Sequence, residues 1–210
     1  MWHLSLAGDF QYFLTAYNFK AQGPYWKVPL GRRDSLTANR TLDNQRSLFE
    51  RYSSKIRICC SRSQHDRSSC TLRYKKICEN ISGAHIIGRG QCKFFANKLY
   101  NFSNASNPNP TLNTTYLQML QSICPNGGLN ATLTSLDPTT PDAFDSNYYS
   151  NLQNGNDLFE SDQVLFSTSG VDTISIVNSF INNQTLFFEN FVASMIKMGN
   201  ISVLTGSEGE

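Results

Sequence analysis

Two consecutive segments near the C-terminus constrain the fold of this 210-residue chain most. DTISIVNSFINN (172–183) and QTLFFENFVASMIKMG (184–199) both repeat apolar residues at the spacing of an amphipathic helix. TTYLQMLQSIC (114–124) has the same character and stops at Pro125 and a glycine pair. A short helix is expected after the stretch 136–145, which is rich in proline and aspartate. Strand patterns are few, so the sequence predicts a mainly α fold.

The segment SGAHIIG (82–88) places a single histidine among small and apolar residues. From Ser82 onward one helical face collects five residues at the appropriate spacing, namely His85, Gly88, Cys92, Phe95 and Leu99. The pattern predicts a continuous helix here. By pattern alone, a lone histidine on an apolar helix face is more often a structural residue than a ligand.

The composition indicates a globular protein with one domain or two small ones. Apolar residues make up 40% of the chain and charged residues 16%. No window approaches the run of about 18 apolar residues that a membrane helix needs. The first nineteen residues lack a basic region and are interrupted by Asp9, so no signal peptide is evident. We therefore expect no membrane partner.

Glycosylation acceptors point to a secreted ancestry. The motif N-x-S/T without proline occurs eight times, more often than the composition predicts. The acceptors are Asn39, Asn80, Asn101, Asn104, Asn113, Asn130, Asn183 and Asn200.

The net charge of +2 hides a strong local imbalance. Residues 46–79 carry nine Lys and Arg against three acidic residues, so the remainder of the chain is acidic. The same segment holds four of the six cysteines. This basic, cysteine-rich segment needs its own explanation.

Two ordinary explanations of the basic segment are weak. Cys60, His65 and Cys70 have part of the spacing of a zinc knuckle, but the position of the fourth ligand is Arg57. A nucleic-acid patch is disfavoured because the charges form no helical face and only two tyrosines could stack on bases. A cysteine-rich binding module thus remains a minor alternative, and we expect no nucleic-acid partner.

Residues 23–45 and nearly everything from Ser82 onward resemble the plant secretory haem peroxidases, the class III family of the horseradish peroxidase type. The motifs are GPYWKVPLGRRDSLTANRTLDNQ, SGAHIIGRGQC, LYNFSNASNPNPTLNTTYLQMLQSICP, LDPTTPDAFDSNYYSNL, SDQVLFSTSG and MIKMGNISVLTGS. The resemblance implies a mostly helical fold in which haem b lies between two helical halves. This chain resembles the proximal portion of that fold, which would be incomplete.

The resemblance implies roles for four residues of a haem site. His85 matches the proximal ligand of the haem iron, and Asp162 matches the carboxylate that accepts from the other ring nitrogen. Gln91 matches a residue near a haem propionate. Phe94 matches an aromatic residue at the exposed haem edge, where reducing substrates approach.

A structural calcium site of the family maps onto five positions. They are the backbone at Ile86, the residues Asp137, Thr140 and Asp145, and the carbonyl of Ala143. Oxygen donors clustered in a turn suit this hard cation. Ile86 stands where the family has threonine, which removes one side-chain oxygen.

Cys92 and Cys124 match a disulfide pair of the family. Such a disulfide fits an oxidising compartment. The resemblance therefore implies a glycoprotein that is extracellular or vacuolar.

The peroxide-binding face of the family has no counterpart in this sequence. The motif R-x-x-F-H-D-C, which supplies the distal histidine and arginine, does not occur, and the other histidines are His3 and His65. We therefore assign no catalytic residue. The C-terminus also stops short of the family's last cysteine.

Two functions follow as expectations. One is a haem peroxidase that uses hydrogen peroxide to oxidise phenolic donors, in the response to oxidative stress. The other is a truncated, inactive fragment that lacks the distal half and binds haem weakly at most. We expect a monomer or, because the missing half would leave a large apolar surface uncovered, a chain that aggregates or depends on a partner.

The resemblance divides the chain into four segments. Residues 1–22 are unmatched, 23–45 are peroxidase-like, 46–81 are the divergent basic segment, and 82–210 form the proximal helical domain. One possible set of codons for ICCSRSQHDRSSCT (58–71) reads FAVQGLNTTDLVA one nucleotide later, which resembles the family sequence at this place. Our hypothesis is that about 46–71 is translated out of frame and that 72–81 is leftover non-coding sequence.

Overall fold

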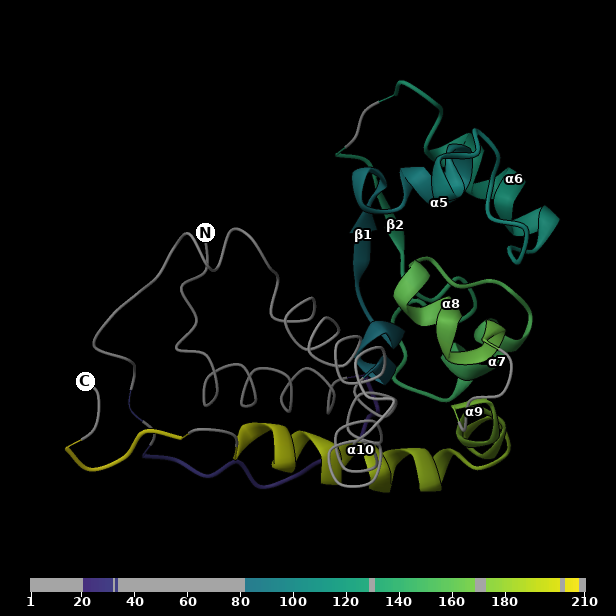
Figure 1. Ribbon diagram of the computed structural model, residues 1–210. Helices are drawn as coiled ribbons and strands as arrows, with labels where there is room; N and C mark the ends of the chain where they lie inside the picture. The colour runs from purple at the N-terminus through teal and green to yellow at the C-terminus, as the bar shows by residue number, and fades with distance from the viewer. Residues whose placement is uncertain are drawn as a thin grey trace, which may run out of the picture. The chain divides into compact units, whose positions relative to one another are not determined.

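The computed structural model describes residues 21–31, 33, 82–128, 131–168, 173–200 and 203–207. The chain divides into two compact units (Figure 1). One unit is Ser82–Phe187, and the other combines the segment up to Ile81 with Phe188–Glu210. The predictions for most of the first 81 residues, including the basic segment, lie outside the described residues.

Helices dominate the described chain, which confirms the mainly α prediction. In chain order the elements are the 3₁₀ helix η1 (Ser82–Ile86), strand β1 (Arg89–Gln91), the 3₁₀ helix η2 (Cys92–Phe94), helix α5 (Ala96–Tyr100), the 3₁₀ helix η3 (Phe102–Asn104), helix α6 (Thr114–Ile123), strand β2 (Leu133–Ser135) and helices α7 (Asn147–Gln153), α8 (Glu160–Ser167), α9 (Thr173–Asn182) and α10 (Gln184–Gly199). The amphipathic patterns at 114–124, 172–183 and 184–199 thus correspond to α6, α9 and α10.

The continuous helix predicted from Ser82 is wrong. The chain instead forms η1, then β1, then η2 and α5. Gly88 has a φ of +121°, a conformation that ends a right-handed helix and that side-chain-bearing residues rarely adopt. β1 then pairs antiparallel with β2, with Gly90 opposite Thr134. The helical spacing of apolar residues therefore spans a turn and a strand.

A buried apolar cluster joins α5 to α6. It contains Cys92, Phe95, Leu99, Leu112, Tyr116, Leu120, Cys124 and Leu158. Asn113 caps α6, since its side-chain oxygen accepts from the backbone N–H groups of Thr115 at 3.0 Å and Tyr116 at 3.3 Å. The cluster fixes α5 against α6 and against the segment that leads into α8.

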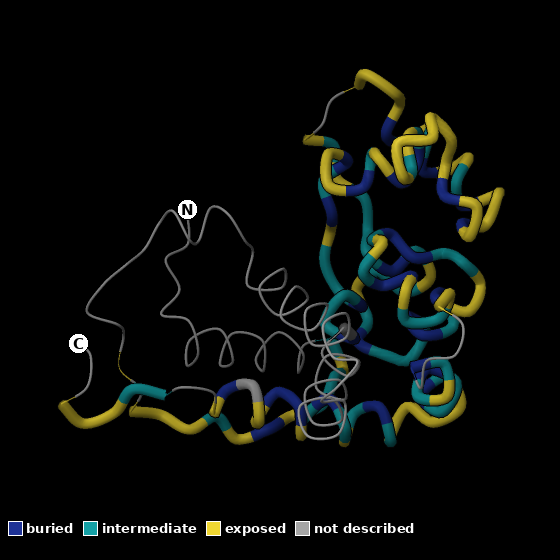
Figure 2. Tube along the Cα trace, viewed as in Figure 1, coloured by how far each residue is buried: buried dark blue, intermediate teal, exposed yellow. Residues whose placement is uncertain are grey.

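A second, aromatic cluster holds η1 in place. The rings of Phe180 and Phe187 each lie 5.0 Å from the ring of Tyr149, and Phe144 stacks on Phe187 at 5.6 Å. A Cβ at Gly83 would meet the Phe187 ring at 2.7 Å, so only glycine lets η1 approach this closely. Figure 2 shows the buried positions of α7, which carries Tyr149. The turn with the lone histidine is therefore packed on a rigid base.

The described residues of the other unit lie along α10. Trp26 is buried and meets the Phe191 ring edge-on, with 5.9 Å between ring centres. Arg33 donates its backbone N–H to the carbonyl of Leu204 at 3.0 Å. Residues 23–31 form neither helix nor strand, in line with the extended segment that their prolines favour. Over the described part of the chain, we find no helix with the length and hydrophobicity that spanning a membrane requires.

Candidate functional site

A histidine and an aspartate from distant elements form the centre of the candidate site. His85 lies in η1 and is half-buried, whereas Asp162 lies in the first turn of α8 and is buried. The imidazole Nδ1 lies 2.9 Å from Oδ1 and 3.0 Å from Oδ2 of the carboxylate. A neutral imidazole that donates from Nδ1 carries its lone pair on Nε2, which is the form that binds a metal.

The surroundings of the imidazole set its charge. Burial lowers the pKa of His85, but the charge and the hydrogen bond of Asp162 outweigh burial and raise this pKa above its ordinary value. The ring of Phe159 meets the imidazole edge-on, with 5.4 Å between ring centres. Asp162 thus fixes both the orientation and the basicity of the imidazole.

A buried ion pair lies beside the segment that leads into α8. The Lys98 ammonium, on α5, contacts the carboxylate of Asp157 and donates to the backbone carbonyl of the same residue at 2.8 Å. Its distance to the carbonyl of Phe159 is 3.5 Å. Burial raises the pKa of Asp157 to about 6, although Lys98 acts in the opposite direction. No sequence pattern predicted this pair, because its partners lie 59 positions apart.

A second polar network holds α8 from another side. Gln163, next to Asp162, donates to the hydroxyl of Thr111 and lies 3.4 Å from the side-chain amide of Asn109. The Thr111 hydroxyl in turn donates to the Asn109 side-chain oxygen at 2.8 Å. This network was also missed, because its partners lie more than fifty positions apart in the sequence.

The expected calcium residues gather around the turn before α7. Asp137 is buried, and its Oδ1 accepts from the backbone N–H groups of Thr139 at 2.6 Å and Thr140 at 2.9 Å. Its Oδ2 is buried without a hydrogen-bond partner. Burial raises the pKa of Asp137, the turn N–H groups lower it, and the nearby charge of Asp145 raises it further.

Asn147 links two other members of the expected calcium set. Its side-chain amide donates to Asp145 at 3.0 Å and to the Thr140 hydroxyl at 3.1 Å. The backbone N–H of Ala143 donates to the carbonyl of Thr140 at 3.2 Å. Ile86 is fully buried in η1 and presents no side-chain oxygen. Among the described residues, no three His, Cys, Asp or Glu side chains are grouped to hold a metal, so backbone and hydroxyl oxygens would have to complete the set.

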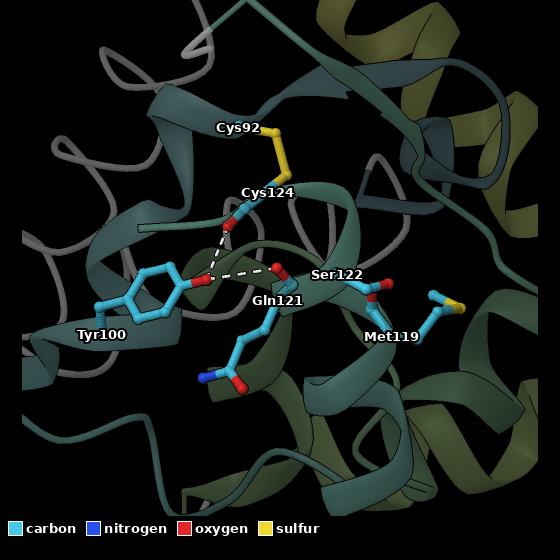
Figure 3. The surroundings of a disulfide bond; sticks show 6 residues. All are labelled: Cys92, Tyr100, Met119, Gln121, Ser122 and Cys124. Atoms are coloured by element: carbon cyan, nitrogen blue, oxygen red, sulfur yellow. Dashed lines mark hydrogen bonds between the residues drawn. A yellow bond between two sulfur atoms is a disulfide. The ribbon is translucent and has the colours of Figure 1, made fainter. Parts of the chain in front are cut away.

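The remaining predicted site residues lie on one continuous stretch. Gln91 is half-buried at the end of β1, and Phe94 is 67% exposed, with the Lys93 ammonium 4.9 Å from its ring centre. Cys92 and Cys124, the pair that the resemblance implied, form a disulfide (Figure 3).

The disulfide is tied to α5 by a tyrosine. The Tyr100 hydroxyl donates to the carbonyl of Cys124 at 2.7 Å and lies 3.5 Å from that of Gln121, as the dashed lines in Figure 3 show. The side-chain amide of Gln121 donates back to the carbonyl of Leu99 at 3.2 Å. These contacts anchor the last turn of α6 to α5.

A buried carboxylate that fixes the tautomer of a histidine is typical of metal-binding histidines. Comparison with known proteins gives the class. A family model described as peroxidase matches residues 5–183, and this chain belongs to the peroxidase family. The matched range begins before Gly23, where the motif resemblance starts, and it runs through the basic segment.

The relatives are plant class III enzymes, which confirms the resemblance. The chain is 53% identical over 198 residues to peroxidase 15 of Ipomoea batatas, covering 90% of this chain and 56% of that protein. It is 46% identical to the lignin-forming anionic peroxidase of Nicotiana tabacum, at 90% and 57% coverage. It is 45% identical to a peroxidase of Armoracia rusticana, at 90% and 52% coverage. The chain thus spans about half the length of these curated relatives.

Proposed function

We propose that this chain is a haem peroxidase that uses hydrogen peroxide to oxidise small phenolic donors, with His85 as the axial ligand of haem b. The observation that carries the proposal is the contact of the His85 Nδ1 with both oxygens of Asp162. This contact leaves the lone pair on Nε2, as a neutral axial ligand requires. Family membership supports the same chemistry, and the response to oxidative stress is its expected role.

The residues of the chain would tune and orient the cofactor. Haem, when bound, supplies the redox chemistry that couples peroxide reduction to one-electron oxidation of the donor. Asp162 accepts a hydrogen bond from the Nδ1 N–H, which increases the basicity of Nε2 and would strengthen its bond to haem iron. Gln91 would contact a propionate, and Phe94 offers an exposed aromatic surface to a phenolic donor.

The peroxide side of the reaction has no assigned residues in this chain. Cleavage of the O–O bond needs a general base near the peroxide and a cation that stabilises the developing charge. The family motif that supplies both is absent from the sequence. The alternative is therefore an inactive haem binder, and the experiment below separates the two functions.

We further propose a structural calcium ion at the turn before α7. The fit rests on the Oδ2 of Asp137, a buried carboxylate oxygen without a hydrogen-bond partner. Cations satisfy such an oxygen readily, and oxygen donors in a tight turn are the ligands that calcium prefers. Asp145, the Thr140 hydroxyl and the carbonyls at Ala143 and Ile86 would complete the set.

We propose an extracellular or vacuolar location for the protein. The disulfide between Cys92 and Cys124 favours an oxidising compartment. Five of the glycosylation acceptors are exposed in the structure, namely Asn101, Asn104, Asn113, Asn183 and Asn200. Digestion of the secreted chain with a glycosidase, followed by mass spectrometry, tests their use.

Titration of the refolded chain with hemin tests the proposed function. We expect an absorption band of five-coordinate ferric haem in the parent chain and in His65→Ala, and loss of the band in His85→Ala. His65→Ala is the matched control for adventitious binding by a histidine. Guaiacol oxidation with peroxide then separates an enzyme from an inactive haem binder. A band that survives in His85→Ala, or no band in any variant, contradicts the proposal.

A further inference from the structure

We propose that Lys98 is a positioning residue for the His85–Asp162 pair and acts on it through the segment Asp157–Phe159. The Lys98 ammonium is buried, with 3% of its side chain exposed. A lysine ammonium has three N–H donors. All contacts of this ammonium point to one segment: the Asp157 carboxylate, the Asp157 carbonyl at 2.8 Å and the Phe159 carbonyl at 3.5 Å.

The held segment leads directly into the helix that carries Asp162. The carbonyl of Phe159 accepts the backbone N–H groups of Asp162 and Gln163, each at 3.2 Å, so it forms the first turn of α8. The same carbonyl is the third acceptor near Lys98. Displacing it would therefore shift the backbone of Asp162 and its carboxylate together.

The same segment also contacts the imidazole. The ring of Phe159 meets the His85 ring edge-on at 5.4 Å, while Leu158 belongs to the apolar cluster around α5. A Cβ at Gly90 would come within 2.9 Å of Leu158 and 3.0 Å of Phe159, so β1 packs tightly on this segment. Lys98 thus holds a segment that touches the imidazole on one side and positions its carboxylate on the other.

Stability alone does not account for a buried ion pair at this place. Two apolar side chains of similar volume often stabilise a fold as much as a buried ion pair does. Charge-assisted hydrogen bonds, in contrast, require a specific geometry of donor and acceptor. Helix α5, which carries Lys98, is itself held against the end of α6, since the Tyr100 hydroxyl donates to the carbonyl of Cys124 at 2.7 Å. These features favour a positioning role for Lys98.

The imidazole proton of the haem-free chain gives a direct test. In protein labelled with ¹⁵N-histidine, the Nδ1 proton held by Asp162 should exchange slowly with water, and His85→Gln assigns its signal. We expect Lys98→Met to speed this exchange about tenfold, because the hydrogen bond opens more often. Lys98→Arg keeps the donors and the charge, and it should restore the slow exchange.

A matched control separates positioning from general loss of stability. Leu99 is the neighbour of Lys98 on α5 and is fully buried in the apolar cluster that also contains Leu158, so Leu99→Ala weakens packing there but leaves the contacts of the Lys98 ammonium in place. Leu99→Ala should lower stability without changing the exchange of the Nδ1 proton. Unchanged exchange in Lys98→Met, or equally fast exchange in Leu99→Ala, overturns the proposal. If Lys98→Met does not fold, Lys98→Met combined with Asp157→Asn leaves no buried charge unpaired and takes its place.

A second measurement connects the positioning role of Lys98 to the proposed haem site. The functional importance of Lys98 rests on that proposed function. The Fe–His stretching frequency of the ferrous, hemin-loaded chain reports how strongly Asp162 accepts from the imidazole. Asp162→Asn should lower this frequency, Lys98→Met should lower it by a smaller shift, and Lys98→Arg and Leu99→Ala should not. An equal frequency in Lys98→Met and the parent overturns the role at iron. If no variant binds hemin, the proposed function fails while the exchange experiment still decides the positioning role.

Discussion

The two acid–base pairs around α8 differ in what they expose. In the Lys98–Asp157 pair, 3% and 1% of the side chains are accessible, whereas the imidazole of the His85–Asp162 pair is 19% accessible. The ammonium contacts oxygens of one chain segment, while the imidazole contacts the Asp162 carboxylate through its Nδ1. The closed Lys98–Asp157 pair is therefore suited to hold backbone in place, whereas the more open His85–Asp162 pair is partly accessible to solvent.

The largest expected effect is the loss of stability when the closed Lys98–Asp157 pair is broken. Lys98→Met leaves the Asp157 carboxylate buried and unpaired, so we expect a loss of about 3–5 kcal/mol in the free energy of unfolding. Urea denaturation of the haem-free chain measures it. Lys93→Met, at an exposed lysine on η2, should change the stability by less than about 0.5 kcal/mol. Equal losses in the two variants would show that the pair at Lys98 is not closed to solvent.

The disulfide variant tests whether the crosslink itself contributes to the position of the imidazole. Replacing Cys92 and Cys124 by alanine opens a loop of 32 positions and should lower the free energy of unfolding by about 2–4 kcal/mol. Differential scanning calorimetry measures the change, with the reduced parent chain as a second reference. The Nδ1 proton of His85 should keep its slow exchange. Faster exchange would mean that the disulfide, too, supports the open pair.

A smaller change in stability should appear in mildly acidic solution, through the carboxylate of Asp157 in the closed pair. Burial raises the pKa of Asp157 to about 6, above the value of about 3.9 in an unfolded chain. The folded chain then binds this proton more tightly, so the contribution of Asp157 falls by about 2–3 kcal/mol as the pH rises from 4 through 6. Urea midpoints between pH 4 and 7 should decline more steeply in the parent than in Asp157→Asn. Parallel profiles would contradict the raised pKa.

The smallest change in stability should appear at higher pH, through the imidazole of His85 in the open His85–Asp162 pair. Asp162 raises the pKa of His85 above its ordinary 6.5, so the pair stabilises the fold below this pH. That contribution is lost as the pH rises through the folded pKa of the histidine. The parent should lose stability relative to His85→Gln as the pH rises above 6.5, and an NMR titration of the imidazole should give a midpoint above 6.5. A midpoint below 6.5 would mean that desolvation dominates.

Local patterns predicted the long helices correctly. The segments predicted at 114–124, 172–183 and 184–199 contain α6, α9 and α10 because one apolar face of each helix packs on the core, and their periodicity is visible in a short window. For the segment after Ser82, the same periodicity predicted a continuous helix that does not form. The spacing of its apolar residues is helical, but the positive φ of Gly88 and the pairing of β1 with β2 decide the backbone.

The candidate site depends on contacts that no local pattern contains. His85 and Asp162 are 77 positions apart, and only the resemblance of their flanking motifs implied that they act together. Lys98 and Asp157 lie 59 positions apart and belong to no motif that the resemblance explained. Their pairing follows from how α5 packs near the start of α8, which is a property of the folded chain.

The long sequence separation of both pairs has a consequence for synthesis. A ribosome has released η1 and α5 well before α8 is made, so neither the imidazole nor the ammonium meets its carboxylate at first. Closing such long loops is entropically costly and slows folding. During this interval the Cys92–Cys124 crosslink can already join α5 to α6, since it needs only the 32 positions between its ends. An oxidant present early in translation should therefore raise the yield of native protein, whereas one added after release should help less.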